Sequence, residues 1–174
     1  VYTAVLFHDA EGAPGYYSAD GKSLQKAFLR SPLKFAARIS SHFSLHRLHP
    51  ILKIRRPHLG TDYAAPTGTP VQAIASGQII AAARKGGNGI YVCLRHSNGY
   101  ETYYMHLSRS LVHTGQHVNQ GQRIGLVGMT GRATGPHLDF RLQKNGRFVD
   151  CERLKLPPAF PVAKADIEWI IGNA

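Results

Sequence analysis

The stretch GQIIAAARKGGNGIYVCLRHSNGYETYYMH, residues 77–106, decides the fold. It holds three short runs rich in apolar residues, and two turn signals separate them, Gly86-Gly87-Asn88-Gly89 and Ser97-Asn98-Gly99. Asn-Gly supplies the positive φ that tight hairpin turns require. Short runs joined by such turns predict antiparallel strands connected by hairpins.

Runs of the same kind recur on both sides of this stretch, while helical periodicity is absent from residues 46–150. Many short strands at this spacing predict an all-β domain, an antiparallel β sandwich or barrel-like sheet. The expected strands are Val71–Ile74, Gln78–Ala83, Ile90–Leu94, Glu101–His106, Arg123–Val127, Leu138–Leu142 and Arg147–Val149.

Two smaller segments flank the predicted domain of residues 46–150. Residues 1–45 predict a hairpin, with strands around 1–7 and 16–17, followed by a short helix at Ser23–Leu29 that Ser23 would cap. This segment is too small for a core of its own, so we expect it to pack on the domain. Residues 151–174 form a tail with a helical turn or strand at 165–171. The chain begins at Val1 without an initiator Met, so we expect residues 1–45 to end a longer upstream region.

The composition is strongly basic. Of 174 residues, 21 are Lys or Arg and 10 are Asp or Glu, which gives a net charge of +11. A polyanionic partner or surface is therefore expected, but no zinc-finger spacing or aromatic RNA-binding motif indicates nucleic acid. No apolar run reaches the roughly 18 residues of a transmembrane segment. We expect Cys93 and Cys151 to be small buried thiols, and the alternative is a disulfide between them, which an oxidising compartment would allow.

Three of the ten histidines lie in patterns that can build one site. His58 precedes Asp62 by four residues, and His137 precedes Asp139 by two. On a strand, residues i and i+2 project from the same face, so His137 and Asp139 can address a single point. His106 ends a predicted strand and would point from a neighbouring one.

Catalytic zinc sites use three protein ligands and leave one position open. His58, Asp62 and Asp139 supply three such ligands. His106 and His137 are then left for acid–base chemistry and for stabilising an oxyanion. Spacing alone leaves a structural hydrogen bond within His137-Leu138-Asp139 as an alternative. Five other histidines have simpler expected roles: His96 makes a structural hydrogen bond, and four lie on the surface, His46, His49, His113 and His117.

Several motifs in order resemble the LytM/lysostaphin-type zinc metallopeptidases, which are peptidoglycan endopeptidases. PHLGTDYAAPTGTPV at residues 57–71 is similar to the first motif of that family, and YYMHLS at 103–108 to its second. VNQGQ at 118–122 and GMTGRATGPHL at 128–138 match the approach to its third. The resemblance covers residues 40–150.

The resemblance implies a role for each residue of the cluster. The family's zinc ligands correspond to His58, Asp62 and position 139, and its catalytic histidines to His106 and His137. Position 139 departs from the family, because it is Asp where the family usually has His. An Asp oxygen is an accepted zinc ligand, so the expected cofactor is still one zinc ion per chain.

We therefore expect an extracytoplasmic zinc endopeptidase that acts on the peptide cross-links of bacterial peptidoglycan, in the periplasm or cell envelope. The first alternative is a weak or inactive LytM-type domain that binds the wall or activates another hydrolase. The second is a basic binding module without enzymatic activity, which only the positive charge supports. Two carboxylates and one neutral imidazole carry −2. On that count, Asp139→His leaves a more positive site, which predicts tighter zinc binding and an activity optimum at lower pH.

Overall fold

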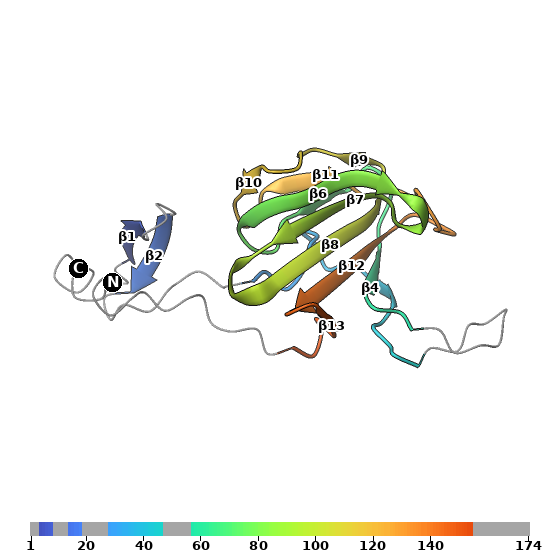
Figure 1. Cartoon of the computed structure of the whole chain (residues 1–174), viewed down its shortest axis with the longest axis horizontal. Coiled ribbons are helices and arrows are strands. Elements are labelled where there is room, and N and C mark those ends of the chain that lie inside the picture. The colour runs from blue at the N-terminus through green and yellow to red at the C-terminus, as the bar shows by residue number, and fades with distance from the viewer. Residues whose placement is uncertain (1–3, 9–13, 19–27, 47–56, 155–174) are drawn as a thin grey trace. The chain divides into compact units, whose positions relative to one another are not determined.

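The computed structural model describes residues 4–8, 14–18, 28–46 and 57–154. The chain divides into two compact units, Val1–Leu29 with Lys155–Ala174, and Arg30–Leu154. In the first unit, β1 (Ala4–His8) and β2 (Pro14–Ser18) form the expected antiparallel hairpin (Figure 1). The predicted helix at Ser23–Leu29 lies outside the described residues except for its last two, and the predicted element at 165–171 lies wholly outside them. The domain boundaries at residues 45 and 150 stay predictions.

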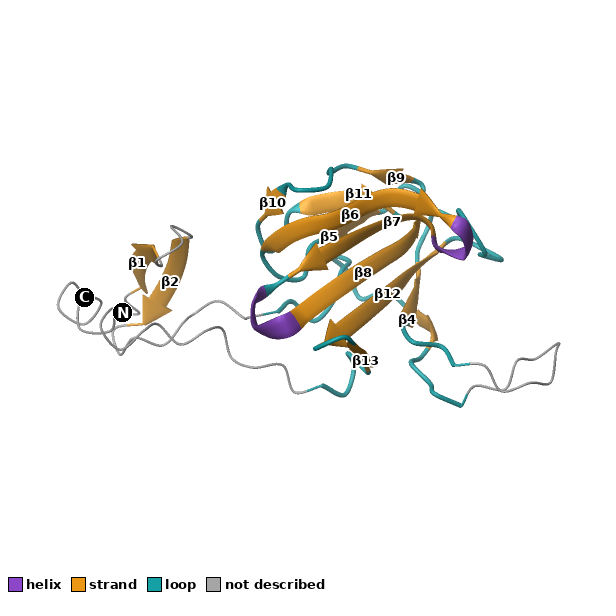
Figure 2. Cartoon of the chain, in the orientation of Figure 1, coloured by secondary structure: helices purple, strands orange, loops and turns teal. Residues whose placement is uncertain are grey.

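The second unit is built on an antiparallel sheet with the strand order β10-β6-β7-β8-β12-β4-β3, and β13 also pairs with β12 (Figure 2). A three-stranded sheet, β5-β11-β9, accompanies it. The strands of the larger sheet are β3 (Ile39–Ser41), β4 (Thr61–Ala64), β6 (Gly77–Lys85), β7 (Gly89–Arg95), β8 (Tyr100–Leu107), β10 (His117–Val118), β12 (His137–Lys144) and β13 (Arg147–Val149); those of the smaller are β5 (Pro70–Gln72), β9 (Arg109–Ser110) and β11 (Arg123–Leu126).

The core lies between the two sheets, and one buried tyrosine ties them together. The side chain of Tyr104 on β8 is fully buried, and its hydroxyl accepts a hydrogen bond from the Ile74 amide at 3.1 Å, just beyond β5. Its ring also lies against that of Phe140 on β12, with centroids 5.3 Å apart. The same core contains the buried side chains Val71, Val92, Leu94, Leu107, Ile124, Val127, Leu138 and Leu142.

The all-β prediction is confirmed, and each of the seven predicted runs overlaps a strand. The described residues contain only two helical segments, single 3₁₀ turns at Gly86–Asn88 and Ser97–Gly99, where hairpin turns were predicted. Within that part of the chain no helix is long and apolar enough to cross a bilayer. The prediction missed β4, a four-residue strand with Gly60 before it and Pro66 after it, whose residues show no extended apolar run.

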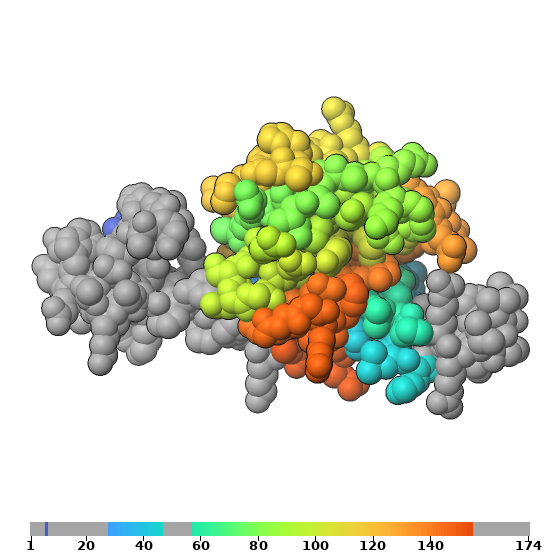
Figure 3. Space-filling model, in the orientation of Figure 1, coloured from blue at the N-terminus to red at the C-terminus, as the bar shows by residue number. Residues whose placement is uncertain are grey.

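Strand β12 separates the core from the face that carries the candidate site. Leu138, Phe140 and Leu142 are buried toward the core, so by alternation His137, Asp139 and Arg141 project from the other face. Residues of β6, β7 and β8 and those of β12 and β13 together cover one side of the unit in the space-filling view (Figure 3). His137 and Asp139 thus lie on one face of β12, as the alternation along a strand predicted.

Candidate metal centre

His58 and Asp62, from the stretch that leads into β4, converge with Asp139 from β12. Asp62 on β4 lies directly opposite Asp139 on β12 in the antiparallel register. His58 precedes β4, where its amide and carbonyl bridge to Ser44. Its Nε2 lies 3.1 Å from Asp62 Oδ1, and one ligand atom from each of the three residues lies within 4.8 Å of the others. Their side chains are only 12%, 16% and 5% exposed, respectively.

The predicted pair of catalytic histidines lies beside this cluster. The rings of His106 and His137 have centroids 4.8 Å apart and are tilted by 53°. His137 Nε2 is 4.0 Å from Asp62 Oδ1. The structure therefore brings all five predicted site residues together, although the role of each is still a prediction.

Backbone carbonyls fix which nitrogen each imidazole turns toward the cluster. His58 Nδ1 lies 3.0 Å from the His42 carbonyl, His106 Nδ1 2.8 Å from the Thr130 carbonyl, and His137 Nδ1 2.8 Å from the Gly135 carbonyl. A carbonyl oxygen can only accept, so these contacts require the hydrogen on Nδ1. In His106 and His137 the Nε2 lone pair of the neutral ring is then left to bind a metal or accept a proton. His58 Nε2 instead faces an accepting carboxylate oxygen, Asp62 Oδ1 at 3.1 Å, so it carries a hydrogen that metal binding would displace.

His106 occupies a β-bulge with an unusual backbone. The register between β7 and β8 slips at this point, so that Met105 and His106 lie opposite Tyr91 alone. His106 has φ +61°, in the left-handed region that residues with a side chain rarely adopt. Bulges and such backbone conformations redirect side chains and occur often next to active sites.

The surroundings shift two of the imidazoles in opposite directions. Burial lowers the pKa of His106, and the neighbouring His137 adds to this effect, so His106 is neutral at pH 7. Burial alone would lower the pKa of His58 as well. Its hydrogen bonds to Asp62 and the His42 carbonyl, with the negative charges of Asp62 and Asp139, outweigh burial and raise that pKa.

Asp139 has a partner that the sequence reasoning missed. Both of its oxygens accept hydrogen bonds from Arg141, from Nε at 3.1 Å and from a terminal nitrogen at 2.8 Å. Arg141 follows Asp139 by two residues on the same face of β12, so the alternation argument used for His137 could have found it. Its guanidinium also lies 5.8 Å from the ring centre of Phe148 on β13.

The donor set suits a zinc ion. One imidazole nitrogen and two carboxylate oxygens are among the ligands zinc takes, and three protein ligands are the number found in catalytic sites. The ligand atoms cluster closely enough for a single ion to be shared, and they are largely shielded from solvent. Each carboxylate oxygen has two lone pairs, so Asp139 can bind a metal while still accepting from Arg141.

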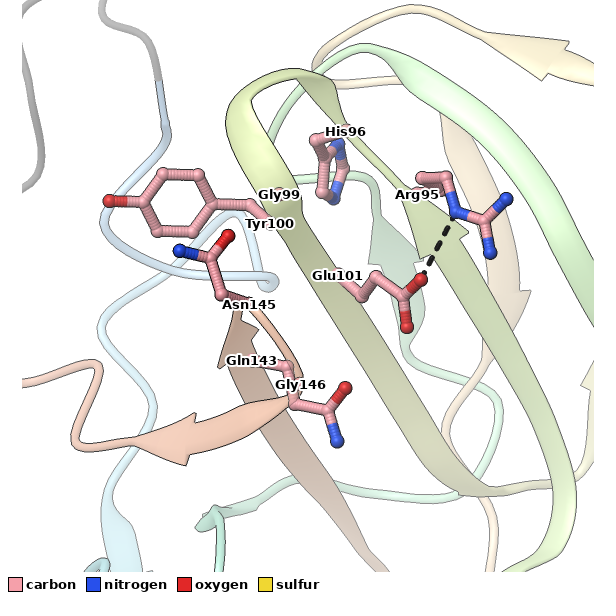
Figure 4. A pocket seen from close by; sticks show the side chains of 8 residues that line it. All are labelled: Arg95, His96, Gly99, Tyr100, Glu101, Gln143, Asn145 and Gly146. Atoms are coloured by element: carbon pink, nitrogen blue, oxygen red, sulfur yellow. Dashed lines mark hydrogen bonds and ion pairs between the residues drawn. The ribbon is translucent and has the colours of Figure 1, made fainter.

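A hollow lies where β8 begins and β12 ends, at the other end of these strands from His106 and Asp139 (Figure 4). It is shallow, with an empty volume of about 510 Å³ that includes open solvent, and an ion pair between Arg95 and Glu101 at 3.1 Å borders it. His96, also in its lining, has both ring nitrogens in contact, with the Ser76 carbonyl at 2.8 Å and Thr102 Oγ1 at 2.7 Å. The structural hydrogen bond predicted for His96 is confirmed.

Other predictions about side chains have mixed outcomes. His46, His113 and His117 are exposed, as predicted, whereas His49 lies outside the described residues. Cys93 and Cys151 are both free, as predicted; Cys93 is buried, whereas Cys151 is partly exposed and not buried as expected.

Three potential metal ligands on an all-β frame, with two further imidazoles beside them, are the groups that a single-metal hydrolase uses. Residues 56–151, more than half of the chain, match peptidase family M23, and the chain belongs to this family. The resemblance to LytM/lysostaphin-type metallopeptidases is thereby confirmed.

Named relatives share much of the sequence. The chain is 44% identical over 173 residues to the peptidoglycan DD-endopeptidase ShyC of Vibrio cholerae. This match covers 99% of this chain and 39% of that protein. It is 50% identical over 140 residues to the DD-carboxypeptidase/endopeptidase Mpg of Neisseria meningitidis serogroup B, covering 79% of this chain and 32% of that protein. The chain thus spans less than two fifths of the length of these curated relatives.

Solved structures share the fold. A zinc-containing peptidase from Vibrio cholerae superimposes with a TM-score of 0.74 and 39% identity, over 88% of this chain and 47% of that one. The catalytic domain of lysostaphin from Staphylococcus simulans gives a TM-score of 0.58 and 33% identity, over 66% of this chain and 88% of that domain.

Proposed function

We propose that this chain is the catalytic part of a zinc-dependent endopeptidase that cuts peptide cross-links of bacterial peptidoglycan. The observation that carries the proposal is the convergence of His58, Asp62 and Asp139 beside His106 and His137 in a member of family M23. His58, Asp62 and Asp139 would hold one zinc ion per chain. Such an ion supplies Lewis-acid polarisation of the scissile carbonyl and activation of a water molecule.

The two remaining histidines would move the protons. With Nδ1 occupied by a backbone carbonyl, each presents Nε2 to the reacting groups. His106 is neutral at pH 7 because burial lowers its pKa, so its Nε2 can accept a proton. In its protonated form, either ring can donate to the leaving amine or hydrogen-bond the developing oxyanion, and we assign these tasks to the pair jointly.

The relatives' names favour one kind of cross-link. ShyC is named a peptidoglycan DD-endopeptidase and Mpg a DD-carboxypeptidase/endopeptidase, so we propose that the bond cut joins two D-amino acids. This substrate places the enzyme outside the cytoplasm, in the periplasm or cell envelope. The net charge of +11 would favour its binding to an anionic wall.

Digestion of cross-linked peptidoglycan by the purified chain, with and without a chelator, tests this proposal. We expect soluble fragments in the native sample, their loss on chelation and their return with added zinc. His106→Ala and His137→Ala should retain zinc and lower turnover about a hundredfold or more, the range for a lost acid or base. The matched control His113→Ala, at an exposed position, should leave turnover unchanged.

The results that contradict the proposal are specific. Chelator-resistant digestion would remove zinc from the mechanism, and loss of zinc from His106→Ala or His137→Ala would make that histidine a ligand. One observation favours the second candidate function, an inactive domain that activates another wall hydrolase: Arg141 donates a hydrogen bond to each oxygen of Asp139, which makes both oxygens weaker donors to a metal. Native protein that binds no zinc yet stimulates a separate wall hydrolase would establish this candidate instead.

A further inference from the structure

Arg141, which is paired with Asp139, is the charged residue of the site to which the catalytic scheme gives no role. The side chain of Asp139 is 5% exposed and that of Arg141 26%, so the pair is largely shielded from solvent. Two parallel N–H···O contacts join them, the geometry in which a guanidinium fixes both the position and the plane of a carboxylate. Arg141 therefore fixes the position and the plane of the Asp139 carboxylate.

The neighbouring residues fit around this pair. A Cβ placed on Gly60 would collide with Asp139 Oδ1 and would come within 2.7 Å of Arg141 Cγ and 2.8 Å of the Phe140 carbonyl. On the other side, Phe148 contacts the guanidinium and rests on Tyr103, with ring centroids 5.7 Å apart. The Arg141 side chain is thus packed between Gly60, in the segment before β4, and Phe148 on β13.

The charges around the cluster change when Arg141 is included. His58 contributes no charge, Asp62 and Asp139 contribute −1 each, and Arg141 contributes +1, for a total of −1. Two neutral imidazoles and one carboxylate give the same −1. The count of −2 made from the sequence left Arg141 out, and so did the expectation that Asp139→His would bind zinc more tightly.

We propose that Arg141 is a positioning residue that enables an aspartate to act as the third zinc ligand, by orienting the Asp139 carboxylate and balancing its charge. The inference rests on the zinc site of the proposed function. In an Asp139→His variant, Arg141 has no carboxylate to orient and only repels the ion. Even with the dielectric constant of water, one unit charge a few ångströms from a divalent ion changes its affinity about tenfold.

Zinc affinity, measured by competition with a chromophoric chelator, separates the roles of the two residues. We expect Asp139→His to bind zinc about tenfold more weakly than the native chain, and adding Arg141→Met to that variant to restore about tenfold. In the chain that keeps Asp139, Arg141→Met should raise zinc affinity far less than tenfold, or lower it, because the Asp139 carboxylate loses both of its hydrogen bonds. The effect of Arg141→Met should therefore differ between the two backgrounds by about tenfold or more.

The control for net charge is Arg147→Met, at an exposed position on β13, which should change zinc affinity less than about twofold in either background. Melting of each variant in chelator checks that it folds. Should Arg141→Met not fold with Asp139, Arg141→Lys replaces it, since it keeps the charge but not the two-pronged contact. In the Asp139 background, Arg141→Lys should bind zinc more weakly than the native chain. In the Asp139→His background, the same substitution should leave zinc affinity unchanged.

The contrary outcomes are distinct. Equal effects of Arg141→Met in both backgrounds would make Arg141 a distant charge and overturn the positioning role. An Asp139→His variant that binds zinc as tightly as the native chain, or more tightly, would overturn the charge balance. A native chain that binds no zinc would overturn the proposed function together with this inference, whereas the first two results leave the proposed function standing.

Discussion

Replacing Gly60 with Ala should destabilise the domain through one methyl group. The added Cβ meets three atoms at distances that real Cβ atoms do not show, and one of them, the Phe140 carbonyl oxygen at 2.8 Å, belongs to the backbone of β12. Flexible side chains such as Arg141 can move aside, but a strand paired on both sides moves only at the expense of its register. Overpacking of this kind costs about 1–3 kcal/mol, and the backbone contact favours the upper half of that range.

An opposing effect is smaller. Ala restricts the unfolded chain more than Gly does and stabilises by about 0.4–1 kcal/mol where its backbone conformation is compatible. The net loss of unfolding free energy is then about 2 kcal/mol. For a domain of this size each kcal/mol shifts Tm by about 4 °C, so Tm should fall by roughly 8 °C. Zinc affinity should fall as well, because the methyl group displaces Asp139 Oδ1.

Thermal melting in chelator and zinc competition measure the two effects separately. Gly87→Ala is the matched control, because its added Cβ meets nothing closer than the Arg132 Cβ at 3.8 Å. We expect the control to keep both Tm and zinc affinity near the native values. A Gly60→Ala protein that melts within about 1 °C of native and binds zinc equally well would refute the close packing around Asp139.

Three further predictions concern the core, pH and the metal. Leu138→Ala, at a fully buried position, should lower the unfolding free energy in urea by about 2–5 kcal/mol. Burial lowers the pKa of His96 in the folded state, so below pH 6.5 the unfolded chain binds more protons than the folded chain, and the free energy of unfolding decreases as the pH is lowered. The His96→Asn variant should therefore lose less stability than the native chain when the pH is lowered from 7.5 to 5.5. Saturating zinc, at about 100 times its Kd, should stabilise the native chain by about 2.7 kcal/mol in the same urea assay, and His58→Ala should lose that gain.

The sheet could be predicted because its signals are local. Asn98 has φ +57° and Gly99 φ +72°, as the Asn-Gly turn before β8 requires. In β12, Leu138 and Leu142 alternate with polar residues and mark the buried face without any knowledge of the partner strands. Such patterns depend on neighbours one to four residues apart, which a sequence displays directly.

The site was predictable only where a pattern within one segment, or a family motif, pointed to it. His137 and Asp139 share a strand face, but their meeting with Asp62 depends on the pairing of β12 with β4, a strand that the sequence does not reveal. The left-handed backbone of His106 arises from a slip against β7, so it belongs to the pairing and not to the sequence around His106. In the sequence around His106, the slip is marked by the apolar pair Tyr104-Met105, where the alternation of the strand is lost.

The orientation of the imidazoles shows why the surrounding loops matter as much as the ligands. Nδ1 of His106 and His137 contacts the main chain of one segment, through the Thr130 and Gly135 carbonyls. Thr130 is anchored in turn, because its hydroxyl donates to the Leu107 carbonyl at 2.6 Å and accepts from the Ile90 amide at 2.9 Å. No side-chain substitution removes a carbonyl, so the tautomers are fixed by the path of the backbone. Changes that move the 128–136 segment should therefore impair both histidines together, while leaving the proposed zinc ligands Asp62 and Asp139, on β4 and β12, in place.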